Sequence, residues 1–138
     1  MIKIKNIGLL LLLSFNFVQL YSQNNDCMKE FDQRENDTVY VKVTESPQYV
    51  GTQSLLYLLK NEITISQEDI LESKIYVEFV VGVDGFLSNV RIRGKQNSDY
   101  TKLECDIVAF FKSLPKWKPG RCNGTTVRTK VYYPIILN

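Results

Sequence analysis

The sequence predicts a small α+β fold in which two helices pack on an antiparallel sheet. Stretches of alternating apolar and polar residues predict the strands, and two stretches with apolar residues three and four positions apart predict the helices. Two dipeptides typical of tight hairpin turns, Asp84-Gly85 and Asn123-Gly124, indicate antiparallel neighbours. The 138 residues, 44% of them hydrophobic, are enough for one ordinary domain and too few for two.

The N-terminal stretch has the order of a secretory signal peptide. Lys3 and Lys5 precede an apolar run over residues 7–20, and the small residue Ser22 stands just before a polar stretch. We therefore expect residues 1–22 to be removed on export. The alternative is an uncleaved membrane anchor, but the apolar run has only about 14 residues, whereas a spanning helix needs roughly 20.

The charge balance and the absence of histidine exclude several classes of function. Removal of residues 1–22 takes away two lysines and no acid, which leaves 15 basic against 15 acidic residues. A neutral chain gives no electrostatic reason to expect nucleic acid as a partner. Without histidine, Ser-His and Cys-His catalytic pairs are excluded, and a zinc site is not expected. We expect no catalytic residues, no metal and no cofactor.

The three cysteines allow at most one internal disulfide. Export would place them in an oxidising compartment, where such a bond persists. We expect Cys105 to pair with Cys122, since both lie inside the region with regular patterns. Cys27 lies in a polar stretch and is expected to be free.

The first half of the chain is predicted to contain a lead-in, a strand and a helix. Residues 23–38 are polar and lack periodicity, so we expect a flexible lead-in before a domain over residues 39–138. The alternation of Val39, Val41 and Val43 predicts a strand that ends at Ser46-Pro47. A helix is predicted from the apolar stripe that follows, namely Leu55, Leu56, Leu58, Leu59 and Ile63.

The second half is predicted to contain a hairpin, a helix and a final strand. Alternating apolar residues over 75–81 and 88–92 predict two strands on either side of Asp84-Gly85. Thr101 and Glu104 form a capping-box pattern before an apolar helical stripe, and Pro115 stops that helix. The last strand is predicted over residues 126–133, and Pro134 indicates an edge or a strand end because proline cannot donate to a ladder. The stripe of the second helix consists of Leu103, Ile107, Phe110, Phe111 and Leu114.

Two sets of side chains could suggest a binding site, but an ordinary structural role explains each of them. Trp117 follows the helix stop, where an aromatic residue usually packs over the sheet. Five basic residues on predicted strands and their connections more often form the solvated side of a sheet than a binding face. These are Arg91, Arg93, Arg121, Arg128 and Lys130.

Five blocks of the sequence, in their order and spacing, resemble the C-terminal domain of TonB. The resemblance covers roughly residues 39–137. In the order and spacing of these blocks, the chain is similar to the short secreted TonB-like proteins of Gram-negative bacteria. The most specific block is Leu114-Pro115-Lys116-Trp117-Lys118-Pro119-Gly120. The others are Ser46-Pro47-Gln48-Tyr49-Val50-Gly51, residues 77–85, Val90-Arg91-Ile92-Arg93-Gly94 and Val131-Tyr132-Tyr133-Pro134-Ile135.

The resemblance implies a periplasmic protein-binding domain. In the family, the domain binds a short peptide of an outer-membrane TonB-dependent transporter, and the peptide adds as an extra strand to the edge formed by the last strand. The matching positions here are Thr126, Val127, Arg128, Thr129, Lys130, Val131, Tyr132 and Tyr133.

Two alternatives remain open at this point. One is a membrane-anchored energy transducer of the TonB type, with inner-membrane motor proteins as partners, and the other is a structural module of an envelope assembly. The stretch from residue 21 to residue 37 spans at most roughly 60 Å and has no proline, whereas transducers of the family have a long proline-rich spacer. Chain length therefore favours the released periplasmic form.

Overall fold

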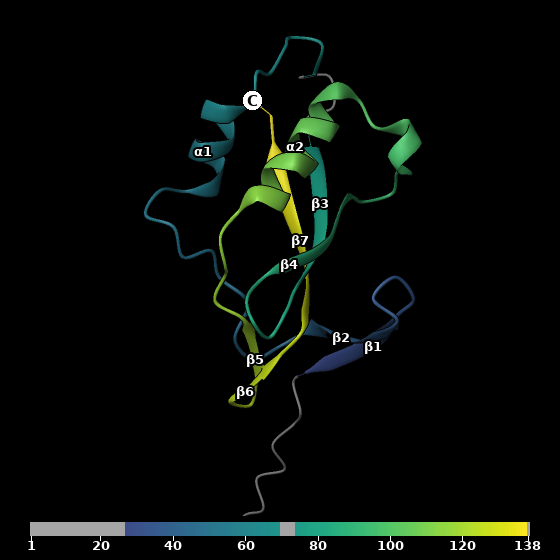
Figure 1. The fold of residues 1–138 in the computed structure, drawn as a ribbon, viewed down its shortest axis with the longest axis vertical. Coiled ribbons are helices and arrows are strands. Elements are labelled where there is room, and N and C mark those ends of the chain that lie inside the picture. Colours follow the sequence, from purple (N-terminus) through teal and green to yellow (C-terminus); the bar gives the residue numbers. More distant parts are fainter. Residues whose placement is uncertain (1–26, 70–73, 138) are drawn as a thin grey trace, which may run out of the picture.

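The structure, a computed structural model, describes residues 27–69 and 74–137 and has the predicted α+β class. The expected signal peptide over residues 1–22 lies outside the described residues. A five-stranded sheet and a separate two-stranded sheet are accompanied by two α-helices (Figure 1). The elements are β1 (Met28–Asp32), β2 (Asp37–Lys42), α1 (Leu55–Glu62), β3 (Lys74–Val81), β4 (Leu87–Ile92), η2 (Asn97–Asp99), α2 (Lys102–Ser113), β5 (Gly120–Cys122), β6 (Thr125–Val127) and β7 (Thr129–Ile136).

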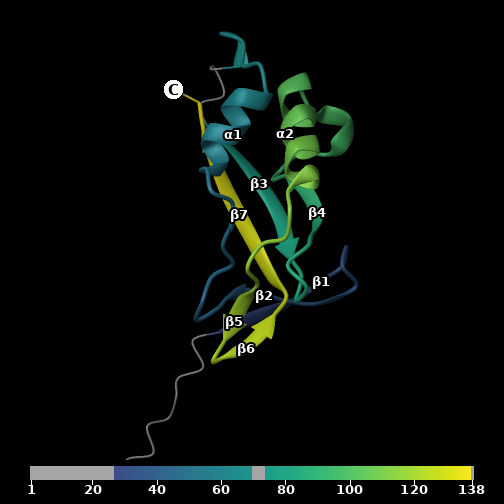
Figure 2. The same ribbon diagram turned by 60° about the vertical axis from the view of Figure 1, so that its left-hand side comes forward.

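The large sheet has the strand order β1-β2-β7-β3-β4. Its centre is the antiparallel pair of β3 and β7, in register from Lys74 opposite Ile136 to Val81 opposite Thr129. In contrast, β2 meets β7 in parallel and at one position, Tyr40 opposite Thr129. Figure 2 shows the reason, because the β1–β2 hairpin lies across the end of β7 instead of running alongside it. The sheet is therefore mixed, and antiparallel everywhere except at this contact.

Local sequence signals determine where α2 and the turns lie. The Thr101 hydroxyl accepts a hydrogen bond from the Glu104 N–H, and the Glu104 carboxylate accepts one from the Thr101 N–H, so the predicted capping box is confirmed. The helix ends at Ser113, two residues before Pro115. Both predicted hairpin turns are also confirmed, with Gly85 and Gly124 at φ values of 84° and 83° that favour glycine.

The main core lies between the helices and one face of β3 and β7. Phe79 of β3 contacts Phe111 of α2 with ring centroids 5.5 Å apart, and Trp117 with centroids 5.2 Å apart. Trp117 is only 6% exposed, which confirms that it packs over the sheet. The other sheet residues of this core include Ile75, Val77, Val81, Ile92 and Ile135.

Two predictions about the strands are wrong. The expected flexible lead-in contains β1, which pairs with β2 through a turn in which the Asp32 carboxylate accepts hydrogen bonds from the N–H groups of Arg34 and Glu35. The expected last strand over 126–133 is two strands, because the chain changes sheets between Val127 and Thr129.

Candidate functional site

The side of β7 that faces away from β3 presents main-chain groups. The Arg93 N–H donates to the Tyr76 carbonyl at 2.9 Å, so Tyr76 directs its main chain toward β4. Along an antiparallel ladder this direction alternates, and Tyr76 stands opposite Pro134. The even-numbered residues of β7 therefore direct their N–H and C=O groups away from β3. Arg128 agrees with this rule, since its carbonyl accepts a hydrogen bond of 2.8 Å from the Tyr40 N–H of β2.

Beyond Thr129, this side of β7 is an open edge. Within residues 27–69 and 74–137, no strand pairs with it past the contact of Tyr40 with Thr129. The outward main chain comprises both groups of Tyr132 and Ile136 and the carbonyl of Pro134. Proline has no N–H to donate. Because the main chain of Pro134 faces outward, the β3–β7 ladder needs no donor at this position. Here the "open edge" means the outward main chain from Tyr132 to Ile136.

The two outer strands of the sheet are less suited to strand addition. At β4, the Ile92 N–H donates to the Tyr100 hydroxyl at 2.9 Å, so this side is partly covered. β1 is a terminal strand of five residues with charged side chains at Lys29 and Glu30. Short length and charge are the features that discourage pairing at an edge.

A groove with a volume of about 400 Å³ lies on the helix side of β7. Val131 and Tyr133, the inward-facing neighbours of the open edge, form one wall. The opposite wall is held in place by reciprocal main-chain hydrogen bonds of 3.0 and 2.8 Å between Gln48 and Lys118. Burial raises the pKa of the Tyr133 hydroxyl, a group that is uncharged near pH 7 even at its ordinary pKa of 10.0. The residues that line the groove are Pro47, Gln48, Tyr49, Leu55, Trp117, Val131 and Tyr133.

Trp117 forms the aromatic part of the groove. Its ring stands edge-to-face with Tyr49 at 5.8 Å between centroids. The indole Nε1 is buried and has no hydrogen-bond acceptor among the described residues. A groove of this kind favours apolar side chains over charged ones.

A second hollow of similar volume lies between α1 and α2 and is less suited to binding. Lys102 and Asp106, which contribute to its lining, already form an ion pair of 2.6 Å. No main-chain edge of the sheet adjoins it among its lining residues, which come from α1, the turn after it and α2.

The face of the sheet opposite the helices exposes aromatic side chains next to the open edge. Tyr132 is 40% exposed, and the Arg93 guanidinium lies over its ring at 4.4 Å from the centroid. Lys74 lies over Tyr76 at 5.2 Å in the same way. This end of the sheet is therefore aromatic with cations over the rings.

The other end of this face is covered by the β1–β2 hairpin through ion pairs. Lys130 lies 2.7 Å from both Glu30 and Asp32, and its side chain is only 8% exposed. Burial disfavours the charge on Lys130, but the hydrogen bonds with Asp32 and Glu30 outweigh it and raise its pKa. The expectation that the basic residues form a solvated face is wrong for Lys130, because the hairpin acids surround it.

Arg128 and Arg91 are paired as well. Arg128 contacts Glu35 and Asp37 of the hairpin, the latter at 2.7 Å, and Arg91 pairs with Glu78 of the neighbouring strand. The Glu35 carboxylate also accepts a hydrogen bond of 2.7 Å from the Ser88 hydroxyl. Acidic residues of the hairpin thus neutralise Arg128, which immediately precedes β7, and Lys130 within β7.

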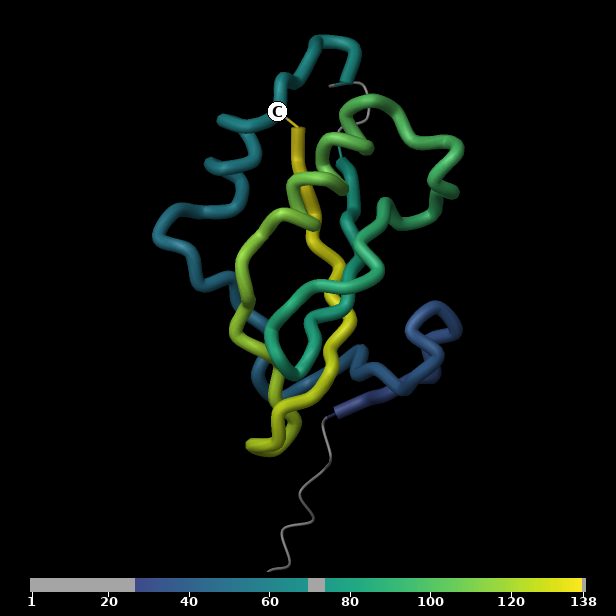
Figure 3. Tube along the Cα trace, in the orientation of Figure 1, coloured from purple at the N-terminus to yellow at the C-terminus, as the bar shows by residue number. Residues whose placement is uncertain are grey.

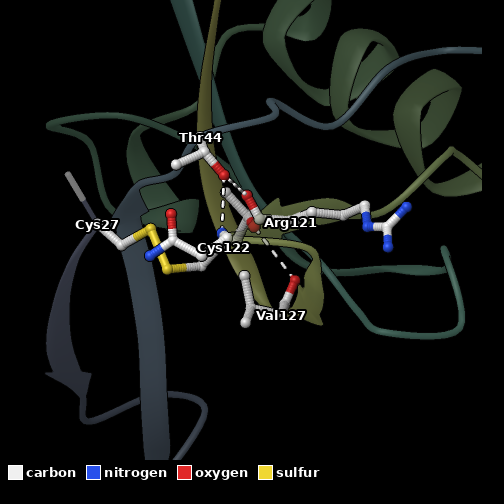
Figure 4. Close-up of a disulfide and its surroundings, with 7 residues drawn as sticks. Cys27, Thr44, Arg121, Cys122 and Val127 are labelled. Carbon is white, nitrogen blue, oxygen red and sulfur yellow. Dashed lines mark hydrogen bonds between the residues drawn. A yellow bond between two sulfur atoms is a disulfide. The ribbon is translucent and has the colours of Figure 1, made fainter. Parts of the chain in front are cut away.

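The structure corrects the predicted disulfide. Cys27 is bonded to Cys122 across 95 positions of sequence, with Cα atoms 6.0 Å apart, and Cys105 is a free, exposed thiol (Figure 4). The prediction failed because it placed Cys27 in a flexible lead-in, whereas Cys27 immediately precedes β1, which begins beside the β5–β6 hairpin (Figure 3). Thr44 binds the same turn, donating to the Arg121 carbonyl at 2.8 Å and accepting from the Asn123 N–H at 2.9 Å.

Of the eight residues predicted to form a binding edge, only some lie on the open edge. Thr126 and Val127 pair with β5, and Thr129 stands opposite Tyr40. Lys130 is held by the hairpin, while Tyr132 is part of the open edge. Pro134 and Ile136, which the prediction left out, complete it, because the strand extends to Ile136.

Comparison with known proteins adds no relative. No protein-family profile matches the chain, and neither a curated protein nor a solved structure matches it. In the part of the chain that the structure describes, no helix is both long and apolar enough to span a membrane.

Proposed function

We propose that this chain is a periplasmic protein-binding domain of the TonB C-terminal type. It would recognise a strand-forming peptide of an outer-membrane TonB-dependent transporter, and the peptide would add to the open edge of β7. The observation behind this proposal is the outward main chain from Tyr132 to Ile136, which lies on the strand that also forms a wall of an apolar groove.

The geometry provides two kinds of interaction for an added strand. Its main chain would hydrogen-bond to the outward groups of Tyr132, Pro134 and Ile136, at a net gain of about 1 kcal/mol for each bond. Successive side chains of a strand point to opposite faces. Alternate side chains would therefore enter the groove beside Tyr133, and the others would lie beside Tyr132 on the opposite face.

Peptide titration tests this proposal. Labelled peptides from the periplasmic N-termini of outer-membrane transporters are titrated against the purified protein, with fluorescence anisotropy as the readout. Trp117 is the only tryptophan of the chain and contributes to the groove, so its emission gives a second, label-free signal. Failure of every such peptide to bind would contradict the proposal.

A substitution at Tyr132 separates main-chain from side-chain recognition. Tyr132→Pro removes the outward N–H, so binding should weaken at least fivefold, which corresponds to one lost hydrogen bond. The matched control Tyr132→Ala loses the ring, as the proline variant does, but keeps the amide, and it should bind within twofold of the wild type. Circular dichroism establishes that both variants fold. A folded Tyr132→Pro variant with unchanged affinity would exclude strand addition at this edge.

A further inference from the structure

We infer that the β1–β2 hairpin is an intramolecular occupant of the binding edge, held there by the Cys27–Cys122 disulfide and released when that bond is reduced. The inference rests on the proposed function, because it concerns the regulation of the same edge. In the oxidised protein, the edge would accept a short strand opposite Tyr132 to Ile136. In the reduced protein, it would accept a longer strand with acidic residues at the end that lies beside Lys130.

The hairpin occupies the same side of β7 as the added strand would. Tyr40 stands opposite Thr129, and its N–H donates to the Arg128 carbonyl, which is an outward group of the same series as those of Tyr132 and Pro134. The open edge therefore begins where the hairpin stops. A peptide that continued toward Thr129 would collide with β2.

The hairpin is attached to β7 mostly by side chains. One main-chain position joins the two strands, whereas β3 and β7 pair along the whole of β7. The hairpin is also held by the buried side chain of Val39, by hydrogen bonds from Ser88 and Asn89 of β4 to Glu35, and by ion pairs from its acidic residues to Lys130 and Arg128. Such pairs can be exchanged for equivalent carboxylates of another chain without loss of charge neutralisation.

The disulfide adds a covalent tether to these contacts. Cys27 immediately precedes β1, and Cys122 is the last residue of β5, beside the turn that leads into β6 and β7 (Figure 4). A dithiol reductant would break the S–S bond: the two cysteines gain two electrons and two protons to become thiols, while the reductant becomes a disulfide. After reduction the hairpin is held by non-covalent contacts alone, so its departure from β7 no longer requires a covalent bond to break.

Release would change the edge in two ways. The outward main chain of Lys130 would join that of Tyr132, Pro134 and Ile136, so a longer strand could pair. The side chains of Lys130 and Arg128 would lose their carboxylate partners and become a cationic end of the edge. An incoming strand with acidic residues at this end would replace both the hairpin strand and its charges.

Two measurements test the inference on the full chain. The first is hydrogen exchange of the Tyr40 amide, whose bond to Arg128 exists only while the hairpin is in place. Exchange should become at least tenfold faster after reduction and in the Cys27→Ser, Cys122→Ser double variant. Cys105→Ser, which leaves the disulfide intact, is the matched control and should behave like the oxidised wild type.

The second measurement is the affinity for synthetic peptides. The probes are a labelled pentapeptide of alternating threonine and valine and the same peptide extended by Asp-Val-Asp at either end. Oxidised protein should bind all of them within twofold. Reduced protein should bind one extended peptide at least fivefold more tightly than the pentapeptide, as one additional main-chain bond implies. A Lys-Val-Lys extension should give no gain.

The outcomes separate this inference from the proposed function. Unchanged protection of the Tyr40 amide after reduction, or an equal gain from the acidic extension in both redox states, would overturn the inference and leave strand addition standing. If no peptide binds either form, strand addition is wrong, and the hairpin's role as an occupant of a binding edge is wrong with it.

Discussion

Lys130 joins β7 to the hairpin that covers one end of the sheet. Its ammonium lies between the carboxylates of Glu30 and Asp32 at 2.7 Å each, and the side chains of Lys130 and Asp32 are both nearly buried. Removal of the cation would leave two neighbouring carboxylates without compensation. At this residue, stability and the position of the hairpin depend on the same contacts.

Substitution of Lys130 should therefore destabilise the protein in a pH-dependent way. Lys130→Met should lower the free energy of unfolding at pH 7 by about 1–3 kcal/mol. The hydrogen bond from Lys130 holds the pKa of Asp32 below its ordinary value of 3.8. The stabilisation is then fully present above pH 3.8 and is lost as the pH falls through the lower folded value, so the difference between variant and wild type should shrink there.

Urea unfolding from pH 7 down to pH 2 measures both effects. Lys29→Met, on the exposed part of the same hairpin, is the control and should change stability by less than about 0.5 kcal/mol. A Lys130→Met penalty that stays constant through acid pH would mean that the ion pair with Asp32 is not its cause.

Trp117 gives a second prediction at the residue scale. Because its buried Nε1 has no acceptor among the described residues, Trp117→Phe should lose packing but no hydrogen bond. We expect a cost of about 1–2 kcal/mol, against about 3–5 kcal/mol for Trp117→Ala. Denaturant unfolding followed by circular dichroism compares the two variants. Equal costs would show that the indole N–H has a partner in solution.

At the scale of elements, the features that the sequence predicted are those with local causes. The capping box of α2 joins residues three positions apart, and both turns depend on a glycine with positive φ. The apolar face of β3 is equally local, since its alternation is visible in the sequence. These signals were sufficient for the α+β class and for most of the element order.

The features that were missed depend on contacts between distant residues. β1 exposes nearly all of its side chains, so it has no apolar face that would reveal a strand. It is held by β2, by ion pairs to Lys130 and by a disulfide that spans 95 positions. The same cause explains why the sequence analysis chose the wrong cysteine pair and did not predict the groove, whose walls come from residues 47–55 and from β7. Even so, Pro134 was a correct local sign of an edge.

At the scale of the whole molecule, the N-terminal and C-terminal parts of the chain meet at one end of the sheet. The disulfide and the contacts of Thr44 join the segment before β3 to the β5–β6 hairpin, next to the start of β7 (Figure 4). A pull on the chain before Cys27 would pass through the disulfide to Cys122 without unfolding the hairpin. Such an attachment is compatible with a domain tethered to the membrane and with a released periplasmic domain.

The mature N-terminus distinguishes a released periplasmic domain from a membrane-anchored transducer. Lys3 and Lys5 before the apolar run over residues 7–20 predict cleavage after Ser22. An uncleaved anchor would need roughly 20 apolar residues to span the bilayer, whereas the run over residues 7–20 has about 14. We therefore expect that the protein from a periplasmic extract begins at Gln23 and that its intact mass lacks residues 1–22. Expression of a variant with Lys3 and Lys5 replaced by glutamate is the control, and export should fall because the positive n-region is gone. Full-length mass in the inner-membrane fraction of the wild type would contradict cleavage and favour the anchored transducer, in which the disulfide would transmit tension toward β7, the strand that we propose as the peptide-binding edge.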